Sequence, residues 1–288
     1  MHQQAAKASQ QIQPLVTVGI PTFNRPHGLR RTLECVTSQT YKNLEIIVSD
    51  NASPGAETDH VVQAISQYDD RIKYFRQPAN MGANPNFKFV LDHAKGKYFM
   101  WFADDDSCGP AFINELVACL ELNPDVALAM CDVQMIEDAT SRTSDVRLSS
   151  IRLDRIARHW EITRKQFFAY PTSNIFFCIY GLYRTEIVKR CNINFVSKWK
   201  GISFASEVPI LAQIALLGKI VSLPKLLKTY VSHSNSMYAR ERGQLNCLDR
   251  MVRHTEIRVA LTWIAIQSGL KLRERMVLGL WPWLSCWY

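Results

Sequence analysis

Three consecutive carboxylates, Asp104, Asp105 and Asp106, follow the apolar run of residues 98–103. We call them the acid triplet. Adjacent carboxylates repel one another, so folded proteins place them together where a cation or hydrogen-bond donors compensate the charge. Mg²⁺ or Mn²⁺ suits this role, because both take oxygen ligands and hold substrate phosphates with one or two protein carboxylates. The alternative is a solvated acidic turn that binds no ligand.

The surrounding elements predict where the acid triplet lies. Short apolar runs at residues 15–20, 44–49, 72–75 and 98–103 are typical of buried strands, and apolar residues at helical spacing occur between them. This alternation predicts a doubly wound, mainly parallel sheet. Ligands of such sheets bind beyond the carboxyl ends of the strands. Asp50 directly follows the second run, so we expect it to face the same crevice as the acid triplet.

Acids on two neighbouring strand ends suit a nucleoside diphosphate. One acid can accept hydrogen bonds from the base or ribose, while the other holds a metal that neutralises the pyrophosphate. The same metal would stabilise a phosphate leaving group in a transfer reaction. The glycine-rich loops of dinucleotide-binding and P-loop proteins are absent from the sequence.

The composition narrows the class of protein. The chain has 288 residues, 47% of them hydrophobic, and a net charge of +8, which is typical of a globular protein with anionic ligands. Lys and Arg are scattered without a recognition motif, so we expect no nucleic-acid partner. The eight cysteines lack zinc-site spacing, which predicts free thiols in a reducing compartment. Residues 1–14 lack the apolar segment of a signal peptide, and no apolar stretch approaches the ~20 residues of a membrane helix, so a cytoplasmic location is expected.

Three segments resemble family 2 glycosyltransferases, which have the GT-A fold. They are VTVGIPTFNR at residues 16–25, SQTYKNLEIIVSDNAS at 38–53, and the stretch at 80–106 that begins with NMG and ends in the acid triplet. The similarity extends to residue 133 and, more weakly, to residue 237.

This resemblance implies an α/β fold with a doubly wound, mixed and mainly parallel sheet, flanked by helices and followed by a more helical C-terminal part. It also implies a metal-dependent inverting enzyme that transfers a sugar from a nucleotide-diphosphate donor to a hydroxyl of a saccharide or lipid-linked saccharide. Such enzymes serve the synthesis of cell-surface polysaccharides or glycans.

The resemblance also assigns roles to residues of the first half. Asp50 would meet the base and ribose, and Asp104 would lie near the ribose. Asp105 would be the tightest ligand of Mn²⁺ or Mg²⁺, with Asp106 beside it. The nucleotide-binding residues are expected to be Pro21, Thr22, Asn24, Arg25, Asp50, Asn80, Gly82 and Asp104.

Two further residues lie in the second half. The sequence Ser206-Glu207-Val208-Pro209 is similar to the family's Glu-Asp-x-Pro pattern, which makes Glu207 the expected catalytic base, with an arm one methylene longer than the commoner Asp. Alternatively, Glu207 only compensates the dipole of the helix that follows.

His233 belongs to a segment resembling Tyr-Arg-x-His-x-x-Ser, in which the His lies near the diphosphate, so His233 is expected at the metal site. Val231 replaces the Arg of that pattern, which removes one expected phosphate contact. The other interpretation of His233 is a polar loop residue.

These assignments divide the chain into a tail (residues 1–14), a nucleotide-sugar-binding half (15–137), a half with the acceptor site and catalytic base (138–240), and a basic, Trp-rich helical extension (241–288). The polar segment 138–150 is predicted to be a loop that orders as a lid over the donor. The extension suits either peripheral contact with the inner face of a membrane carrying a lipid-linked acceptor, or a helix docked on the core.

Two other functions stay open at this point. The chain could be a catalytically inactive scaffold that binds nucleotide or saccharide with the same fold. It could also be a nucleotidyltransferase, although such enzymes usually carry a Gly-rich phosphate loop after the first strand, and residues 21–28 are poor in Gly.

Overall fold

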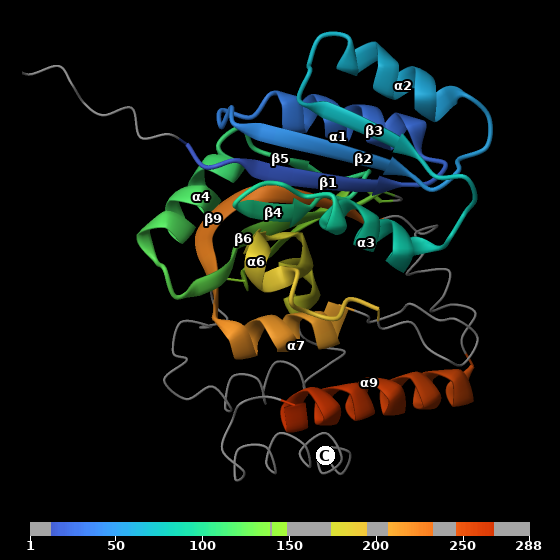
Figure 1. The fold of residues 1–288 in the computed structure, drawn as a ribbon. Helices are drawn as coiled ribbons and strands as arrows, with labels where there is room; N and C mark the ends of the chain where they lie inside the picture. The colour runs from blue at the N-terminus through green and yellow to red at the C-terminus, as the bar shows by residue number, and fades with distance from the viewer. Residues whose placement is uncertain (1–12, 139, 149–173, 195–206, 233–245, 268–288) are drawn as a thin grey trace, which may run out of the picture.

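The computed structural model describes residues 13–138, 140–148, 174–194, 207–232 and 246–267. Within them the chain forms a nine-stranded sheet in the order β3-β2-β1-β4-β8-β6-β9-β5, and β7 pairs with β6 beside this path (Figure 1). The strands are β1 (Val16–Thr22), β2 (Leu44–Asp50), β3 (Ile72–Arg76), β4 (Tyr98–Trp101), β5 (Ser107–Cys108), β6 (Val126–Glu137), β7 (Arg142–Val146), β8 (Leu182–Arg184) and β9 (Lys219–Ser232).

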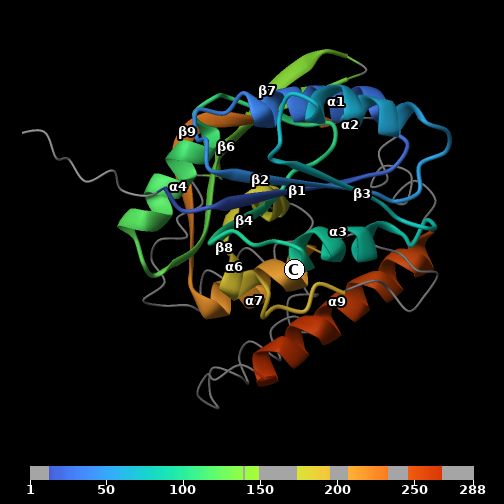
Figure 2. The same ribbon diagram turned by 45° about the horizontal axis from the view of Figure 1, so that its top comes forward.

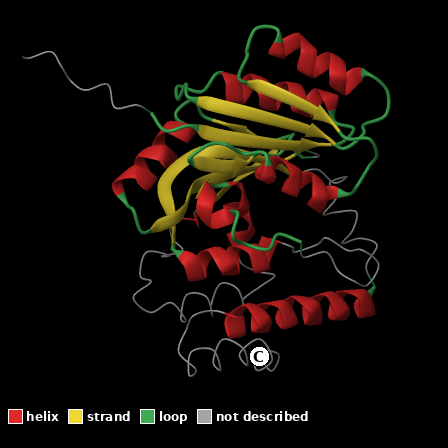
Figure 3. Cartoon of the chain, viewed as in Figure 1, coloured by secondary structure: helices red, strands yellow, loops and turns green. Residues whose placement is uncertain are grey.

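Helices cover both faces of this sheet (Figures 2 and 3). They are α1 (Pro26–Thr37), α2 (Glu57–Ser66), α3 (Ala83–Asp92), α4 (Phe112–Leu122), α6 (Thr185–Val188), α7 (Glu207–Leu217) and α9 (Cys247–Gln267), with the 3-10 helix η3 (Asn174–Tyr180). Helices α1, α2 and α4 enclose one apolar core, whereas α3, α7 and α9 enclose a second core on the opposite face. Every residue of β1 and β2 is buried, as expected for parallel strands covered on both faces.

The parallel half of the sheet aligns the ends of its strands. β1 pairs with both β2 and β4 in parallel, and β2 pairs in parallel with β3. Thr22 lies opposite Asp50 in the register of β1 and β2. Beyond the end of β4, the Phe102 N–H still donates to the Gly19 carbonyl at 2.9 Å, so the chain leaves the sheet immediately before the acid triplet. The prediction that these strand ends share one edge is confirmed.

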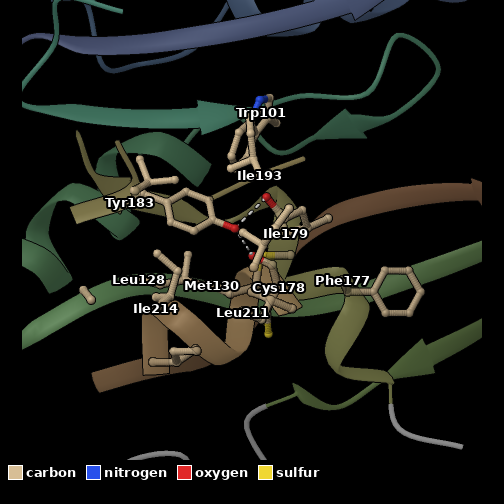
Figure 4. Close-up of a cluster of buried hydrophobic side chains, with 14 of the residues drawn as sticks. Trp101, Leu128, Met130, Phe177, Cys178, Ile179, Tyr183, Ile193, Leu211 and Ile214 are labelled. Carbon is tan, nitrogen blue, oxygen red and sulfur yellow. Dashed lines mark hydrogen bonds between the residues drawn. The ribbon is translucent and has the colours of Figure 1, made fainter. Parts of the chain in front are cut away.

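Antiparallel pairing joins the second part of the chain to the same sheet. β8 pairs antiparallel with β4 and β6, and β9 runs parallel to β6 and antiparallel to β5. Figure 4 shows the core below this junction, where the Tyr183 hydroxyl donates to the carbonyls of Cys178 and Ile179 at 3.2 and 3.0 Å. The Tyr183 ring also packs edge-on against Trp101 at 5.4 Å between ring centroids. These contacts fix η3 under β4 and therefore close to the acid triplet.

Two local predictions were wrong. Residues 142–146 form β7 instead of lying in a loop, because a polar strand suits the exposed edge of β6. The apolar runs at 220–223 and 227–231 both belong to β9, and a shift in its register against β6 accommodates Pro224, which has no N–H to donate. β4 ends at Trp101, two residues before the predicted end of that strand.

Candidate active site

The acid triplet is held by the end of β1 and by helix α1. The Thr22 hydroxyl donates to Asp104 Oδ2 at 2.6 Å. In the middle of α1, the Thr32 hydroxyl lies 3.2 Å from the Ala103 carbonyl and 3.0 Å from the Asp106 carbonyl, which it can reach as a donor. Gly28 lets α1 approach this loop closely, because a Cβ at that position would lie 2.5 Å from the Asp104 carbonyl oxygen. The backbone of the acid triplet is therefore fixed before any ligand binds.

Arg25 brings a positive charge to two of the three carboxylates. Its guanidinium donates to Asp105 in a close ion pair and lies 3.8 Å from Asp104 Oδ1. Burial raises the pKa of the Asp104 carboxyl, although the Thr22 hydrogen bond and the Arg25 charge act in the opposite direction. The structure thus brings together Thr22, Arg25, Asp104 and Asp105, which the sequence had assigned to one site.

A second cation, Lys228 of β9, lies against Asp106. Its Nζ is 3.0 Å from Asp106 Oδ2, and neither side chain is exposed to solvent. The ammonium also lies 3.9 Å from the Phe102 ring centroid and 5.3 Å from that of Tyr180. The sequence did not identify Lys228 as a site residue. The one local indication was its position, because a charged residue is unusual inside an apolar strand.

Asp50 belongs to a separate polar cluster at the end of β2. Its buried carboxylate accepts from the Ser53 N–H at 3.0 Å and from the Tyr74 hydroxyl at 3.1 Å, and the Arg76 guanidinium lies 3.6 Å away. Burial, the hydrogen bond to Asp59 and the charge of Asp50 together raise the pKa of Tyr74, so this hydroxyl stays a donor. Sequence reasoning did not identify Tyr74 or Arg76.

The first loop and the loop before α3 close on this cluster. The Asn24 N–H donates to Ser53 Oγ at 2.7 Å, and Asn24 has a positive φ of 54°. The Asn51 amide donates to Asn80 Oδ1 at 2.8 Å and to the Gly82 carbonyl at 3.1 Å. Pro21 lies in β1 opposite Ser49 of β2. All the predicted nucleotide-binding residues therefore lie at or beside one edge of the sheet.

Glu207 is the first residue of α7 and is partly buried. Tyr180, at the end of η3, connects it electrostatically with the acid triplet. Burial, reinforced by the negative charges of Asp106, Glu207 and Asp104, raises the pKa of Tyr180 far above its ordinary value. Glu207 therefore lies within electrostatic reach of the same tyrosine as two members of the acid triplet. Its position also fits the compensation of a helix dipole.

Two predicted features lie outside the described residues. They are His233, which was assigned to the metal site, and the Trp-rich end of the chain after residue 267.

The carboxylates of the acid triplet fit a hard divalent cation. Among the described residues, Arg25 pairs with Asp105 and Asp104, and Lys228 pairs with Asp106. The side chains of Asp104 and Asp105 are 12% and 14% exposed, whereas that of Asp106 is fully buried. No three His, Cys, Asp or Glu side chains in the described part of the chain form a ready-made metal site. This is the arrangement expected when a metal takes only one or two carboxylates and completes its coordination with phosphate and water.

The comparisons with known proteins agree with this geometry. The sequence profile of Glycosyl transferase family 2 matches residues 17–191. An uncharacterized glycosyltransferase of Haemophilus influenzae is 25% identical over 244 residues, which cover 80% of this chain and 70% of that protein. The GalNAc(5)-diNAcBac-PP-undecaprenol beta-1,3-glucosyltransferase of Campylobacter jejuni is 43% identical over 94 residues, which cover 32% of this chain and 30% of that protein.

Solved structures show the same fold. S. aureus TarS 1-349 in complex with UDP-GlcNAc aligns with a TM-score of 0.65 at 14% identity, over 92% of this chain and 70% of that one. The mannosyltransferase PcManGT from Pyrobaculum calidifontis, in complex with GDP-Man and Mn²⁺, aligns with a TM-score of 0.58 at 15% identity, over 94% and 70%. The expected α/β fold of GT-A type is confirmed.

Proposed function

Because the chain belongs to glycosyl transferase family 2, we propose that it transfers a sugar, with inversion, from a nucleotide-diphosphate donor to a hydroxyl of a saccharide or lipid-linked saccharide. The observation that carries this proposal is the convergence of Thr22, Arg25 and the acid triplet at the strand ends that also hold Asp50. Such an edge binds nucleotides in open α/β sheets. The family match leaves the nucleotidyltransferase alternative without support.

The proposal assigns the donor to the edge formed by β1, β2 and β4. Asp50 and its neighbours would bind the base and ribose, with Asn24, Asn80 and Gly82 closing the pocket from the two adjoining loops. Asp104 would lie near the ribose. The fixed hydrogen bonds around these residues supply a preorganised polar surface, so little ordering is required when the nucleotide binds.

Mn²⁺ or Mg²⁺ is the proposed cofactor, with Asp105 as its first ligand and Asp104 next to it. When bound, such an ion neutralises the diphosphate and so favours its departure. Asp105 would hold the ion in place of part of its contact with Arg25, and the Arg25 guanidinium would then be available to a phosphate oxygen of the donor. The expected role of His233 as a ligand stays a prediction, whereas the full burial of Asp106 against Lys228 favours a role for Asp106 outside the metal's coordination.

Glu207 is the proposed catalytic base. Its carboxylate would accept the proton of the acceptor hydroxyl while the hydroxyl oxygen attacks the anomeric carbon and the nucleoside diphosphate leaves. Attack from the face opposite the leaving group gives inversion. Helix α7, which begins at Glu207, packs in the same apolar core as η3 and as Trp101 at the end of β4, just before the acid triplet, which supports a shared site.

A lipid-linked saccharide is the acceptor class that we favour within this proposal. The name of the C. jejuni relative includes an undecaprenol-linked saccharide. The net charge of +8 would favour approach of this chain to an anionic membrane surface from the cytoplasmic side. In the described part of the chain, no helix combines the length and the apolar character that crossing a bilayer requires. We propose that contact with the membrane is peripheral.

A thermal-shift panel tests the donor site. Nucleoside diphosphates and nucleotide sugars are each combined with Mn²⁺, Mg²⁺ or chelator, on the wild type and on Asp105→Ala. A ligand at about 100 times its dissociation constant stabilises by about 2.7 kcal/mol, so a shift is measurable. We expect one nucleotide to act only with metal and only on the wild type.

Asp92→Ala is the matched control, because Asp92 is a half-exposed carboxylate of α3 that pairs with Lys88. It should respond like the wild type. A shift of equal size in chelator would contradict the metal role of Asp105, and a panel without any shift would contradict donor binding. Release of nucleoside diphosphate by the wild type, with a lipid-linked acceptor present, separates an enzyme from an inactive scaffold.

A further inference from the structure

The ion pair between Lys228 and Asp106 is the most deeply buried charged contact at the site. Both side chains are fully removed from solvent at an Nζ to Oδ2 distance of 3.0 Å, and the contact is an ion pair without the geometry of a directed hydrogen bond. Removing two charges from water is costly, and breaking such a pair on one side leaves an uncompensated buried charge. A pair of this kind therefore constrains the backbone on both sides of it.

Strand β9 contacts Asp106 through two of its residues, Lys228 and Val231. Cys108 of β5 lies opposite Lys228 in the register, and β5 begins directly after the acid triplet. The N–H of Val231, also in β9, lies 3.4 Å from Asp106 Oδ1 as a weak donor. Both carboxylate oxygens of Asp106 therefore face β9.

Aromatic rings enclose the ammonium on its other sides. The Lys228 Nζ lies 3.9 Å from the ring centroid of Phe102, 5.3 Å from that of Tyr180 and 6.0 Å from that of Phe112. Ring faces attract a cation that has lost its water, so the site accepts an ammonium in place of an apolar group. Phe102 also lies just before the acid triplet, so Lys228 contacts the loop on both sides of Asp104 and Asp105.

The three carboxylates thus divide into two groups. Asp104 and Asp105 contact Thr22 and Arg25 from the β1 side and keep part of their surface exposed. Asp106 contacts β9 and has none exposed.

We propose that Lys228 is a positioning residue that anchors Asp106 to β9, so that the loop presents Asp104 and Asp105, and not Asp106, to the donor and its metal. This inference rests on the proposed function. It predicts that Asp106 and Lys228 can be neutralised together without loss of metal-dependent nucleotide binding, whereas either change alone disturbs the loop.

Three variants test it: Asp106→Asn, Lys228→Met and the double variant. Unfolding in urea and the affinity for Mn²⁺, followed by the electron paramagnetic resonance of the free ion with nucleoside diphosphate present, are measured for each. Lys228→Met should lower the folding equilibrium constant by about 100-fold or more, because the buried carboxylate of Asp106 loses the positive charge of Lys228. The double variant should recover most of that loss and bind Mn²⁺ within about threefold of the wild type. A tenfold weaker affinity, which corresponds to about 1.4 kcal/mol, would count as a loss of binding.

Lys225→Met is the matched control on the same strand, because Lys225 forms an exposed pair with Glu115. It should change neither quantity. A well-folded double variant that has lost Mn²⁺ binding would show that Asp106 is itself a ligand and would overturn the inference. Unchanged stability and affinity in Lys228→Met would overturn it as well.

If the proposed function is wrong, the measurements will differ from those that overturn the role of Lys228. A wild-type protein that binds no nucleotide with any metal contradicts the donor site. The coupling between positions 106 and 228 in the unfolding data still tests the anchor in that case, and additive effects of the two substitutions would refute it.

Discussion

The hydroxyl of Thr22, at the end of β1, donates a 2.6 Å hydrogen bond to the buried carboxylate of Asp104, which lies 82 residues later in the chain. This contact joins the first strand of the sheet to the acid triplet. It also explains how a carboxylate that burial disfavours is kept in place, because a charged acceptor strengthens the bond. The stability of the donor site should depend on it.

Thr22→Val should therefore destabilise the protein and weaken nucleotide binding. The substitution keeps the shape of the side chain and removes the donor, which leaves Asp104 with a lost hydrogen bond worth about 1–3 kcal/mol. Urea unfolding and nucleotide titration with Mn²⁺ measure the two effects. Thr22→Ser, which restores the hydroxyl, should lie close to the wild type, and equal losses in both variants would contradict the role of the hydrogen bond.

The negative charge of the buried Asp104 carboxylate should lower the free energy of unfolding at neutral pH. Burial raises its pKa in the folded protein above the ordinary value of 3.8, so the folded state binds the proton more tightly than the unfolded state does. The contribution of Asp104 to the free energy of unfolding therefore decreases as the pH rises from 3.8 through the raised pKa of the folded state. Above that range the contribution stays low. Asp104→Asn should melt at a higher temperature than the wild type at pH 7, and the difference should shrink on acidification.

Nucleotide binding by the same variant supplies the complementary measurement. Removing a carboxylate from the donor site should weaken metal-dependent nucleotide affinity even though the fold is more stable. Stability that decreases on Asp104→Asn at pH 7 would refute the argument from burial.

Gly28→Ala should displace the backbone of the acid triplet, because Gly28 of α1 packs against it. The added Cβ would lie 2.5 Å from the Asp104 carbonyl oxygen, a backbone atom that cannot rotate away. Overpacking of this kind costs about 1–3 kcal/mol, and the shift should also weaken nucleotide affinity. Gly109→Ala is the matched control, because its Cβ would meet only the Leu227 carbonyl at 3.8 Å. Similar effects of the two variants would contradict a specific contact at Gly28.

Glu207→Gln should abolish turnover and keep donor binding. A general base contributes about 100- to 10,000-fold to a rate, so release of nucleoside diphosphate should fall by that factor while the thermal shift with nucleotide and Mn²⁺ is unchanged. Glu207→Asp should retain part of the activity, because it keeps a carboxylate and matches the Asp of the Glu-Asp-x-Pro pattern that the family resemblance implies. If Glu207 only compensates the dipole of α7, Glu207→Gln will lower stability slightly and leave turnover intact.

Among the thiols of the described residues, Cys35 should react at the lowest pH. A hydrogen bond from the Cys108 thiol lowers the pKa of Cys35 to about 7, against the usual value of 9.0, and Cys35 is only partly buried. The thiolate therefore forms as the pH rises through about 7. Alkylation by iodoacetamide, mapped by mass spectrometry, should show a midpoint there at Cys35. Cys178, which is fully buried and has its pKa raised to about 12, should stay unmodified in the folded protein.

The sequence by itself determined the parallel half of the sheet and most of the donor edge. The apolar runs that became β1 to β4 are local signals, and the register of parallel strands brings Thr22, Asp50 and the acid triplet to one edge. Alternating strands and helices leave little freedom in that arrangement. The family resemblance supplied the roles of the individual residues.

Only the tertiary structure decided what surrounds those acids. Lys228 and Tyr74 come from segments whose own sequence gives no sign that they contact a carboxylate, and the same holds for the contact of Tyr180 with Lys228. Lys228 reaches Asp106 because β9 pairs with β5, a contact between distant parts of the chain. The short apolar and polar patterns that predict a strand do not specify which strand it will pair with, since that depends on the packing of the whole sheet.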